Sequence, residues 1–272
     1  MPETRSGVER EIVTIVRGEG PLVAAAIHDG HELRPEVARL LALSDRERRR
    51  EEDPCTGTWT RVSDSRIVAR RSRFEVDLNR PRDEAVYRRP EDAWGLDVWK
   101  SPLPEDVIRR SLAEYDAFYE VVEELLAEKE RRHGRFVVYD IHAYNHRRDG
   151  PDAPEADPAA NPDINVGTGS MDRRRWAPVV DRLIADLRAI DFLGRRLDVR
   201  ENVNFEGGEF PAWVHRRFPA SGAAIALEFK KFFMDEWTGR QHDEVIHAVE
   251  QALRVAAVGT LEAISTLEAI ST

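Results

Sequence analysis

The stretch PLVAAAIH (Pro21–His28) decides the fold class, because it is a continuous apolar run that ends in a polar residue. A run of this length without alternation is typical of a strand that is buried on both faces. Two later stretches share the pattern: FVVYDI (Phe136–Ile141), which His142 follows, and AAIALEF (Ala223–Phe229). Strands of this kind occur in sheets that helices cover on both sides, so the sequence predicts an α/β fold.

Helical patterns alternate with these strands. The clearest predicted helix runs from about Pro104 to Arg132, where apolar residues recur at steps of three and four. We expect shorter helices over 34–43, 176–192 and 241–258, further strands over 66–69 and 73–78, and an exposed loop over 147–162. The chain is expected to be a single three-layer α/β/α domain over residues 1–272, with a central mixed sheet. Its last twelve residues, Leu261–Thr272, are LEAIST written twice, which we interpret as a tail that extends the last helix.

Composition excludes several classes of protein. The chain has 41 Lys+Arg against 51 Asp+Glu and a net charge of −10, which disfavours nucleic acid as a partner. No apolar run approaches the roughly 20 residues that span a membrane, and the N-terminal residues lack the apolar core of a secretory signal. The single cysteine, Cys55, excludes an internal disulfide. We therefore expect a cytoplasmic protein with neither membrane nor nucleic-acid partners, and the sequence gives no indication of its oligomeric state.

Three of the predicted strands end in, or carry, a residue that is unusual in a core: His28, His142 and Glu228. Ligands of open α/β sheets collect at the carboxyl ends of the strands. Two imidazoles and a carboxylate that converge there suit a zinc ion with an open coordination position. The alternative interpretation is that each is a polar residue satisfied at a strand end.

A series of motifs in the same order resembles the N-formylglutamate amidohydrolase family, which is similar in fold and site to the zinc carboxypeptidases. The resemblance covers about Pro21 to Glu236, and its most specific parts are DLNRP (Asp77–Pro81) and the two histidine-bearing strand ends. The motifs are IHDGHEL (27–33), SRFEVDLNRP (72–81), DIHAYN (140–145), NPDINVGTG (161–169), NFEGGEF (204–210) and ALEFKKFFMDE (226–236). The resemblance implies the three-layer fold of the zinc-carboxypeptidase and phosphorylase/hydrolase type.

The resemblance also implies a set of zinc ligands, which includes His28 and His142. The zinc carboxypeptidases take a glutamate three residues after the first histidine, but this chain has His31 there. The family has an acidic segment downstream instead, which favours Glu52 as the third ligand. Asp53 is the alternative, and His31 and Glu32 also remain open.

Glu228 occupies the position of the family's general base. A carboxylate near zinc can take a proton from a metal-bound water and pass it to the departing amine. The alternative for Glu228 is an ion pair with Lys230, which lies on the same face of the strand.

Within DLNRP, the resemblance implies that Arg80 binds a carboxylate of the substrate and that Asn79 supports it, since a guanidinium matches a carboxylate with two parallel hydrogen bonds. The alternative for Arg80 is an ion pair with Asp77 or Asp83. The family also places an arginine near the site at the position of Arg216 or Arg217. Tyr144 and Asn145, which follow His142, are candidates for polarising a carbonyl oxygen.

We therefore predict a zinc-dependent amidohydrolase that cleaves the N-acyl amide of a small, carboxylate-bearing substrate such as N-formylglutamate. One alternative is a carboxypeptidase or deacylase that acts on another N-acyl amino acid or a small peptide. A second is a non-catalytic binding protein with the same fold. The sequence lacks a phosphate-binding loop, a dinucleotide fingerprint and a GxSxG nucleophile elbow.

Overall fold

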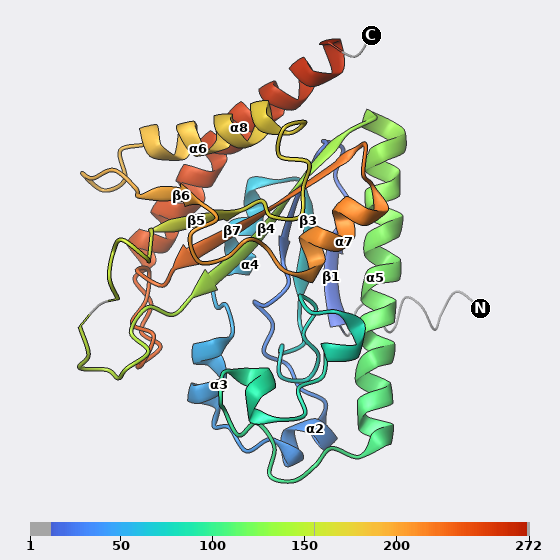
Figure 1. The fold of residues 1–272 in the computed structure, drawn as a ribbon, viewed down its shortest axis with the longest axis vertical. Helices are drawn as coiled ribbons and strands as arrows, with labels where there is room; N and C mark the ends of the chain where they lie inside the picture. The colour runs from blue at the N-terminus through green and yellow to red at the C-terminus, as the bar shows by residue number, and fades with distance from the viewer. Residues whose placement is uncertain (1–11, 155, 271–272) are drawn as a thin grey trace.

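A mixed seven-stranded sheet forms the centre of the molecule in the computed structural model, which describes residues 12–154 and 156–270 (Figure 1). The strands follow the order β1-β3-β2-β4-β7-β5-β6 across the sheet. They are β1 (Val13–Val16), β2 (Leu22–Ala26), β3 (Ser65–Ala69), β4 (Phe136–Tyr144), β5 (Ile164–Gly167), β6 (Val199–Glu201) and β7 (Gly222–Lys230).

The four strands β3, β2, β4 and β7 are parallel, whereas β1 and β5 are antiparallel to their neighbours β3 and β7, and β6 is parallel to β5. The three long apolar runs of the sequence form β2, β4 and β7, which lie side by side in the middle of the sheet. This confirms the predicted α/β fold with a central mixed sheet.

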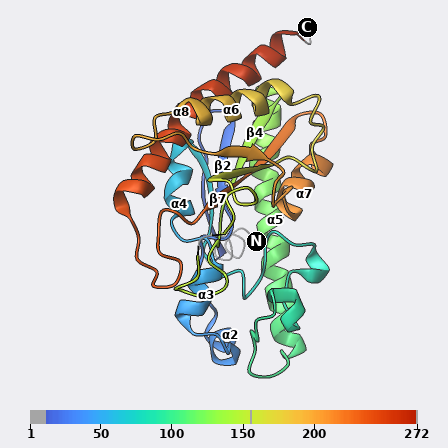
Figure 2. The same cartoon turned by 60° about the vertical axis from the view of Figure 1, so that its left-hand side comes forward.

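Helices cover both faces of the sheet. They are α2 (Pro35–Leu40), α3 (Asp45–Glu51), α4 (Thr56–Trp59), α5 (Glu105–His133), α6 (Ala177–Ala189), α7 (Glu209–Arg217) and α8 (Asp243–Ile270), with 3₁₀ turns at Thr60–Val62, Arg82–Glu84 and Pro90–Ala93. Figure 2 shows α5 and α7 on one side of the sheet and α4, α6 and α8 on the other.

Each face of the sheet has its own apolar core. Alternate residues of β4 and β7 pack with α6 and α8 on one face and with α5 and α7 on the other. A third, smaller cluster, which includes Phe74, Tyr87 and Val98, lies among the loops around α2. Strands β2, β4 and β7 are apolar on both faces. The polar residues of interest lie at or just beyond their carboxyl ends, where the strands leave the apolar core.

The strand predicted over Arg73–Leu78 is wrong. The backbone turns there, with Glu75 N and Val76 N donating to the carbonyl of Ser72. The alternating apolar residues that suggested a strand are buried, but by packing into two different clusters. The acids between them, Glu75 and Asp77, are also buried, at 1% and 0% exposed. The alternation of apolar and charged residues therefore does not mark a strand with one exposed face here, because the apolar and the acidic side chains are both buried.

The last helix is longer than predicted. Helix α8 continues to Ile270 and contains the first LEAIST copy and most of the second, as the tail interpretation proposed, while Ser271 and Thr272 lie outside the described residues. Ile264 of this segment is buried in the core shared with α6. No helix in the described part of the chain combines the length and apolar character that a membrane crossing requires.

Candidate metal centre and active site

The polar residues of three central strands meet at one edge of the sheet. β4 and β7 run parallel in a register that pairs His142 with Glu228. β2 is the other parallel neighbour of β4, and His28 follows its end by two residues. The carboxyl ends of parallel strands lie at the same edge, so the sheet brings His28, His142 and Glu228 together.

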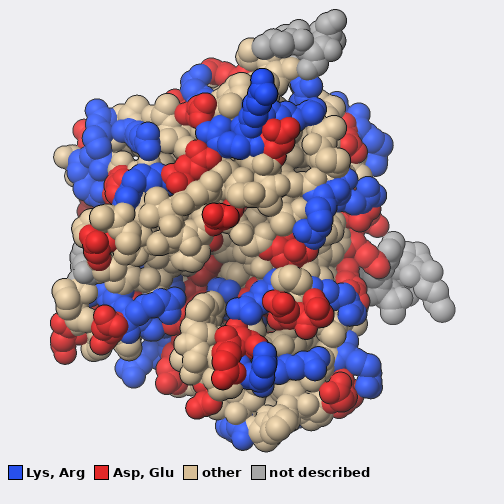
Figure 3. All heavy atoms as spheres, in the orientation of Figure 1, with Lys and Arg blue, Asp and Glu red and all other residues tan. Residues whose placement is uncertain are grey.

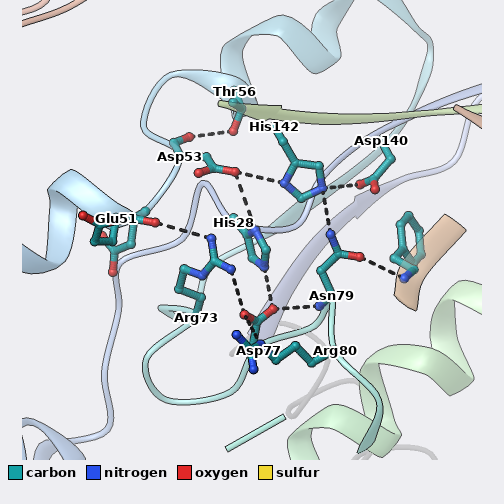
Figure 4. Close-up of polar contacts among 12 residues, drawn as sticks. His28, Glu51, Asp53, Thr56, Arg73, Asp77, Asn79, Arg80, Asp140 and His142 are labelled. Carbon is teal, nitrogen blue, oxygen red and sulfur yellow. Dashed lines mark hydrogen bonds and ion pairs between the residues drawn. The ribbon is translucent and has the colours of Figure 1, made fainter. Parts of the chain in front are cut away.

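His28, Asp53 and His142 form a buried group whose nitrogen and oxygen atoms all lie within 4.8 Å of one another (Figure 4). Oδ2 of Asp53 is 2.9 Å from Nδ1 of His142 and 3.6 Å from Nδ1 of His28. Asp53 comes from the turn after α3, where its backbone N–H donates to the carbonyl of His28 and its own carbonyl accepts from Thr56 Oγ1. Three distant parts of the sequence therefore contribute to one site.

A second pair of carboxylates orients the two imidazoles. Nε2 of His28 is 2.7 Å from Oδ1 of Asp77, and Nε2 of His142 is 3.0 Å from Oδ1 of Asp140. A proton on Nε2 of His28 satisfies its contact with Asp77 and leaves Nδ1 of His28 as a lone pair. The contact of His142 with Asp140 is an ion pair, since neither carboxylate oxygen of Asp140 has a hydrogen-bond partner among the described residues. Metal-binding histidines are typically held in this way. Nδ1 of His28 is buried and has no hydrogen-bond partner among the described residues.

The electrostatics of the group favour a cation. Burial alone would raise the pKa of Asp53, but the neighbouring His142 and His28 hold that pKa well below its ordinary value. Burial alone would lower the pKa of His142, but the carboxylates of Asp140 and Glu228 raise it well above 6.5. Two acceptor atoms as close as Nδ1 of His142 and Oδ2 of Asp53 need a proton or a metal ion between them, and a metal ion displaces protons from such ligands.

Glu52, the first choice for the third ligand, lies outside this group. Its Oε1 atom accepts hydrogen bonds from Nη1 of Arg48 and Oγ of Ser72, both at 2.5 Å. Glu52 is the C-cap residue that follows helix α3, and the adjacent Asp53 lies beside the histidines. The structure therefore places the alternative residue, Asp53, beside His28 and His142.

The remaining ligand candidates also lie outside the group. His31 is exposed, and its carbonyl accepts from Arg48. Glu32 pairs with Arg70 at 2.8 Å. Neither belongs to the cluster of metal-binding atoms among the described residues.

Glu228 is buried beside the metal-binding group. Burial raises the pKa of its carboxyl to about 7, and the nearby His142 opposes that rise. No hydrogen bond or ion pair reaches its carboxylate from the described residues. The alternative partner, Lys230, instead lies 3.4 Å from Asp163 and donates to the carbonyl of Asn161. The carboxylate of Glu228 is thus left available at the cavity described below.

Asn79 connects the site to helix α7. Its Oδ1 atom accepts from the backbone N–H of Phe210 in the first turn of α7, and its Nδ2 atom lies 3.5 Å from Nε2 of His142. The close approach requires Gly208, since a Cβ atom there would lie 2.4 Å from Oδ1 of Asn79.

Arg80 and Arg216 do not reach the site. Nε of Arg80 lies 3.7 Å from Oδ2 of Asp77, and its guanidinium lies over the ring of Tyr87. Arg216 pairs with Glu209 and is 59% exposed. Neither lines the cavity at the metal-binding group. The buried Asp77, which His28 also contacts, attracts Arg80, so the ion pair weighed as its alternative role is the one that the structure shows.

A cavity of about 360 Å³ opens beside this group. Its lining includes His28, Asp53, His142, Glu228 and Asn79 together with three cations that the sequence did not single out: Arg73, Arg148 and Lys231. Figure 3 shows positive and negative side chains interspersed over the face of the molecule seen in Figure 1.

Arg73 and Lys231 have fixed positions in this lining. Arg73 donates from Nη2 to Asp77 at 2.8 Å and lies against Trp94. Lys231 is 1% exposed, and its ammonium donates to the carbonyls of Arg50 and Glu52, the residues just before Asp53. The only signal in the sequence was the position of Lys231 three residues after Glu228. That signal is weak, because a lysine at a strand end is usually solvated.

Comparison with known proteins places the chain among amidohydrolases. The family model described as N-formylglutamate amidohydrolase matches residues 20–234. No curated protein matches the sequence.

Solved structures share the fold at low sequence identity. N-formylglutamate amidohydrolase from Ralstonia eutropha JMP134 is 16% identical with a TM-score of 0.75, over 95% of this chain and 99% of that one. A gene product from Agrobacterium tumefaciens is 18% identical with a TM-score of 0.65, over 96% and 98% of the two chains. A putative carboxypeptidase A from Shewanella denitrificans OS-217 is 13% identical, covers 96% and 68%, and has a TM-score of 0.40, too low for an inference.

Proposed function

Since the chain belongs to the N-formylglutamate amidohydrolase family, we propose that it is a zinc-dependent hydrolase that cleaves the amide bond of an N-acyl amino acid such as N-formylglutamate. The observation that carries this proposal is the buried group of His28, Asp53 and His142, which lies in one cavity with the available carboxylate of Glu228.

The residues of the group fit a zinc ion. Two imidazole nitrogens and one carboxylate oxygen are a ligand set found in catalytic zinc sites, which keep a fourth position open. The buried Nδ1 of His28 lacks a partner, and the carboxylates of Asp77 and Asp140 lie 2.7 Å and 3.0 Å from the two Nε2 atoms. We propose His28, Asp53 and His142 as the ligands. When bound, zinc lowers the pKa of a coordinated water to about 7 and polarises the substrate carbonyl.

Glu228 is proposed as the general base and acid. Its carboxylate accepts a proton from the attacking water while the water oxygen bonds to the acyl carbon. It then delivers that proton to the amide nitrogen as the C–N bond breaks, so the products are a carboxylic acid and a free amine. A pKa near 7 suits both transfers, because the group is then neither too weak as a base nor too weak as an acid at neutral pH.

The substrate carboxylate is proposed to bind at the cationic side of the cavity. Arg73 is held there by Asp77, Tyr87 and the carbonyl of Glu51, and its guanidinium lines the cavity. Arg73 would thus bind the substrate carboxylate, the role that the motif suggested for Arg80. Asn79 also lines the cavity.

The test is hydrolysis of N-formylglutamate by the purified, zinc-loaded protein, measured as formate release. We expect turnover that Glu228→Gln lowers at least 10²-fold, since proton transfer contributes roughly 10²–10⁴-fold. Glu244→Gln, at an exposed position of α8, is the matched control. A protein that binds zinc at this site yet hydrolyses no N-acyl amino acid would instead support the non-catalytic alternative.

A further inference from the structure

A second hollow adjoins the reaction cavity. It measures about 530 Å³ and lies under the loop that follows β4. The two hollows share five lining residues, namely Tyr144, Asn145, Arg148, Asn204 and Phe205. A ligand that starts at the metal-binding group can therefore extend past these residues into the second hollow.

Asn145 stands at this junction with an unsatisfied carboxamide. The residue is 6% exposed, and its Oδ1 atom is buried without a hydrogen-bond partner among the described residues. Buried amides are nearly always paired, because an unpaired one loses its hydration without compensation. A carboxamide has one acceptor and two donors, so its best complement is another amide, which offers the same groups in reverse.

Arg148 provides a cation at the same junction. Its side chain is 50% exposed, and its Nη1 atom is 3.5 Å from Oε2 of Glu51, longer than a hydrogen bond. The guanidinium thus keeps N–H groups for a carboxylate. The rings of Tyr144 and Phe205, whose centroids are 5.3 Å apart, add an apolar surface beside it.

The reaction cavity alone accommodates an N-formyl amino acid. N-formylglutamate has about a dozen non-hydrogen atoms, and at up to roughly 30 Å³ each, the volume that a water occupies, these need at most about 360 Å³. The reaction cavity offers about 360 Å³. The second hollow is therefore space beyond what that substrate fills.

We propose that the preferred substrate is an N-acyl dipeptide, whose second amide pairs with the Asn145 carboxamide and whose terminal carboxylate binds Arg148. This inference rests on the proposed function. Water adds to the acyl carbon, the acyl C–N bond breaks and the proton passes to the nitrogen, so the products are a carboxylic acid and a dipeptide with a free amino group. Asn145 and Arg148 both line the reaction cavity together with His142 and Glu228, so a ligand bound there can contact them.

The experiment compares N-formylglutamate with N-formylglutamyl-alanine on the zinc-loaded full chain. We expect kcat/KM to be at least 10-fold higher for the dipeptide. Asn145→Ala and Arg148→Ala should each lower the ratio of the two kcat/KM values at least 10-fold, whereas Arg174→Ala, at an exposed arginine, should leave the ratio as it is. Amidation of the terminal carboxylate should remove the advantage in the wild type but have no further effect in Arg148→Ala.

Two further readouts separate recognition from a structural role. Zinc content reports whether Asn145→Ala disturbs the neighbouring His142. Calorimetric titration of the zinc-loaded Glu228→Gln variant with the dipeptide should give a Kd that Asn145→Ala weakens at least 10-fold. Equal kcat/KM values for both substrates would overturn the inference and leave the proposed function intact. If neither substrate is hydrolysed, the proposed function fails, and absence of dipeptide binding in the titration overturns the inference separately.

Discussion

The adjacent carboxylates of Glu52 and Asp53 lie in different surroundings. Glu52 is paired with Arg48 and Ser72, whereas Asp53 faces the two histidines. We expect Asp53→Ala to lower zinc affinity at least 100-fold, because the third ligand is lost, while Glu52→Gln keeps the affinity within about threefold. Loss of a residue that only orients a metal ligand lowers metal affinity 10–100-fold, so loss of a ligand itself should lower the affinity by at least the upper end of that range. Competition with a chromophoric chelator gives both affinities.

Loss of zinc in Glu52→Gln but not in Asp53→Ala would contradict this assignment and restore the first expectation from the sequence. Thermal unfolding of both metal-free variants is the control, since Glu52 also holds Arg48 and its substitution lowers stability without touching the ligands.

At this scale the sequence predicted the strand-end residues better than the loop residues. His28, His142 and Glu228 follow or belong to apolar strands, so their common edge follows from topology alone. Asp53 comes from a turn, where side-chain direction depends on local hydrogen bonds such as that from Asp53 N to the carbonyl of His28. Arg80 was expected at the substrate because of its place in the DLNRP motif, and no pattern showed that Asp77, its alternative partner, would be buried.

Among the elements, the half-buried His215 joins α7 to β7. Nε2 of His215 accepts from the backbone N–H of Ala224, and its Nδ1 atom lies 2.8 Å from Oγ of Ser170. Burial lowers the pKa of His215 to about 4. Between pH 6.5 and 4 the unfolded chain therefore binds more protons than the folded one, so this residue makes stability fall as the pH falls through that window.

We expect the free energy of unfolding to decrease by about 2 kcal/mol between pH 7 and pH 5 through His215 alone, at 1.36 kcal/mol per pH unit below 6.5. Urea unfolding in the presence of a chelator, which removes the pH dependence of metal binding, measures this decrease. His215→Gln should reduce the decrease, and His247→Gln, at an exposed position of α8, should not. Identical pH profiles for wild type and His215→Gln would refute the assignment.

Helices and strands could be predicted from the sequence where their apolar pattern was regular. β2, β4 and β7 are apolar on both faces, and α5 has a regular apolar stripe, so each was found. β1, β5 and β6 have three or four residues each and too little pattern to detect. The false strand at Arg73–Leu78 arose because buried charged residues paired within the protein can imitate an exposed face.

For the whole molecule, a bound metal ion would connect three segments that are far apart in the sequence, around residues 28, 53 and 142. An ion that binds only the folded chain stabilises it by about 4 kcal/mol at a thousandfold excess over Kd. For a chain of this size 1 kcal/mol corresponds to about 2–4 °C, so we expect a chelator to lower Tm by roughly 8–16 °C. Differential scanning calorimetry with and without chelator measures the shift.

The Asp53→Ala variant is the control for this shift, because with a ligand missing its Tm should respond to the chelator by only a few degrees. A chelator effect of the same size in both proteins would place the stabilising metal elsewhere on the chain.

The buried ammonium of Lys231 has a practical consequence for labelling. The chain has only four lysines, and both Lys129 and Lys231 are 1% exposed. The ammonium of Lys230 pairs with Asp163 and donates to the carbonyl of Asn161. Lys100 is exposed beside helix α2, where its ammonium donates to the carbonyl of Arg39. Among the lysines of the described residues, an amine-reactive fluorophore therefore attaches chiefly at Lys100, away from the side chains of the reaction cavity.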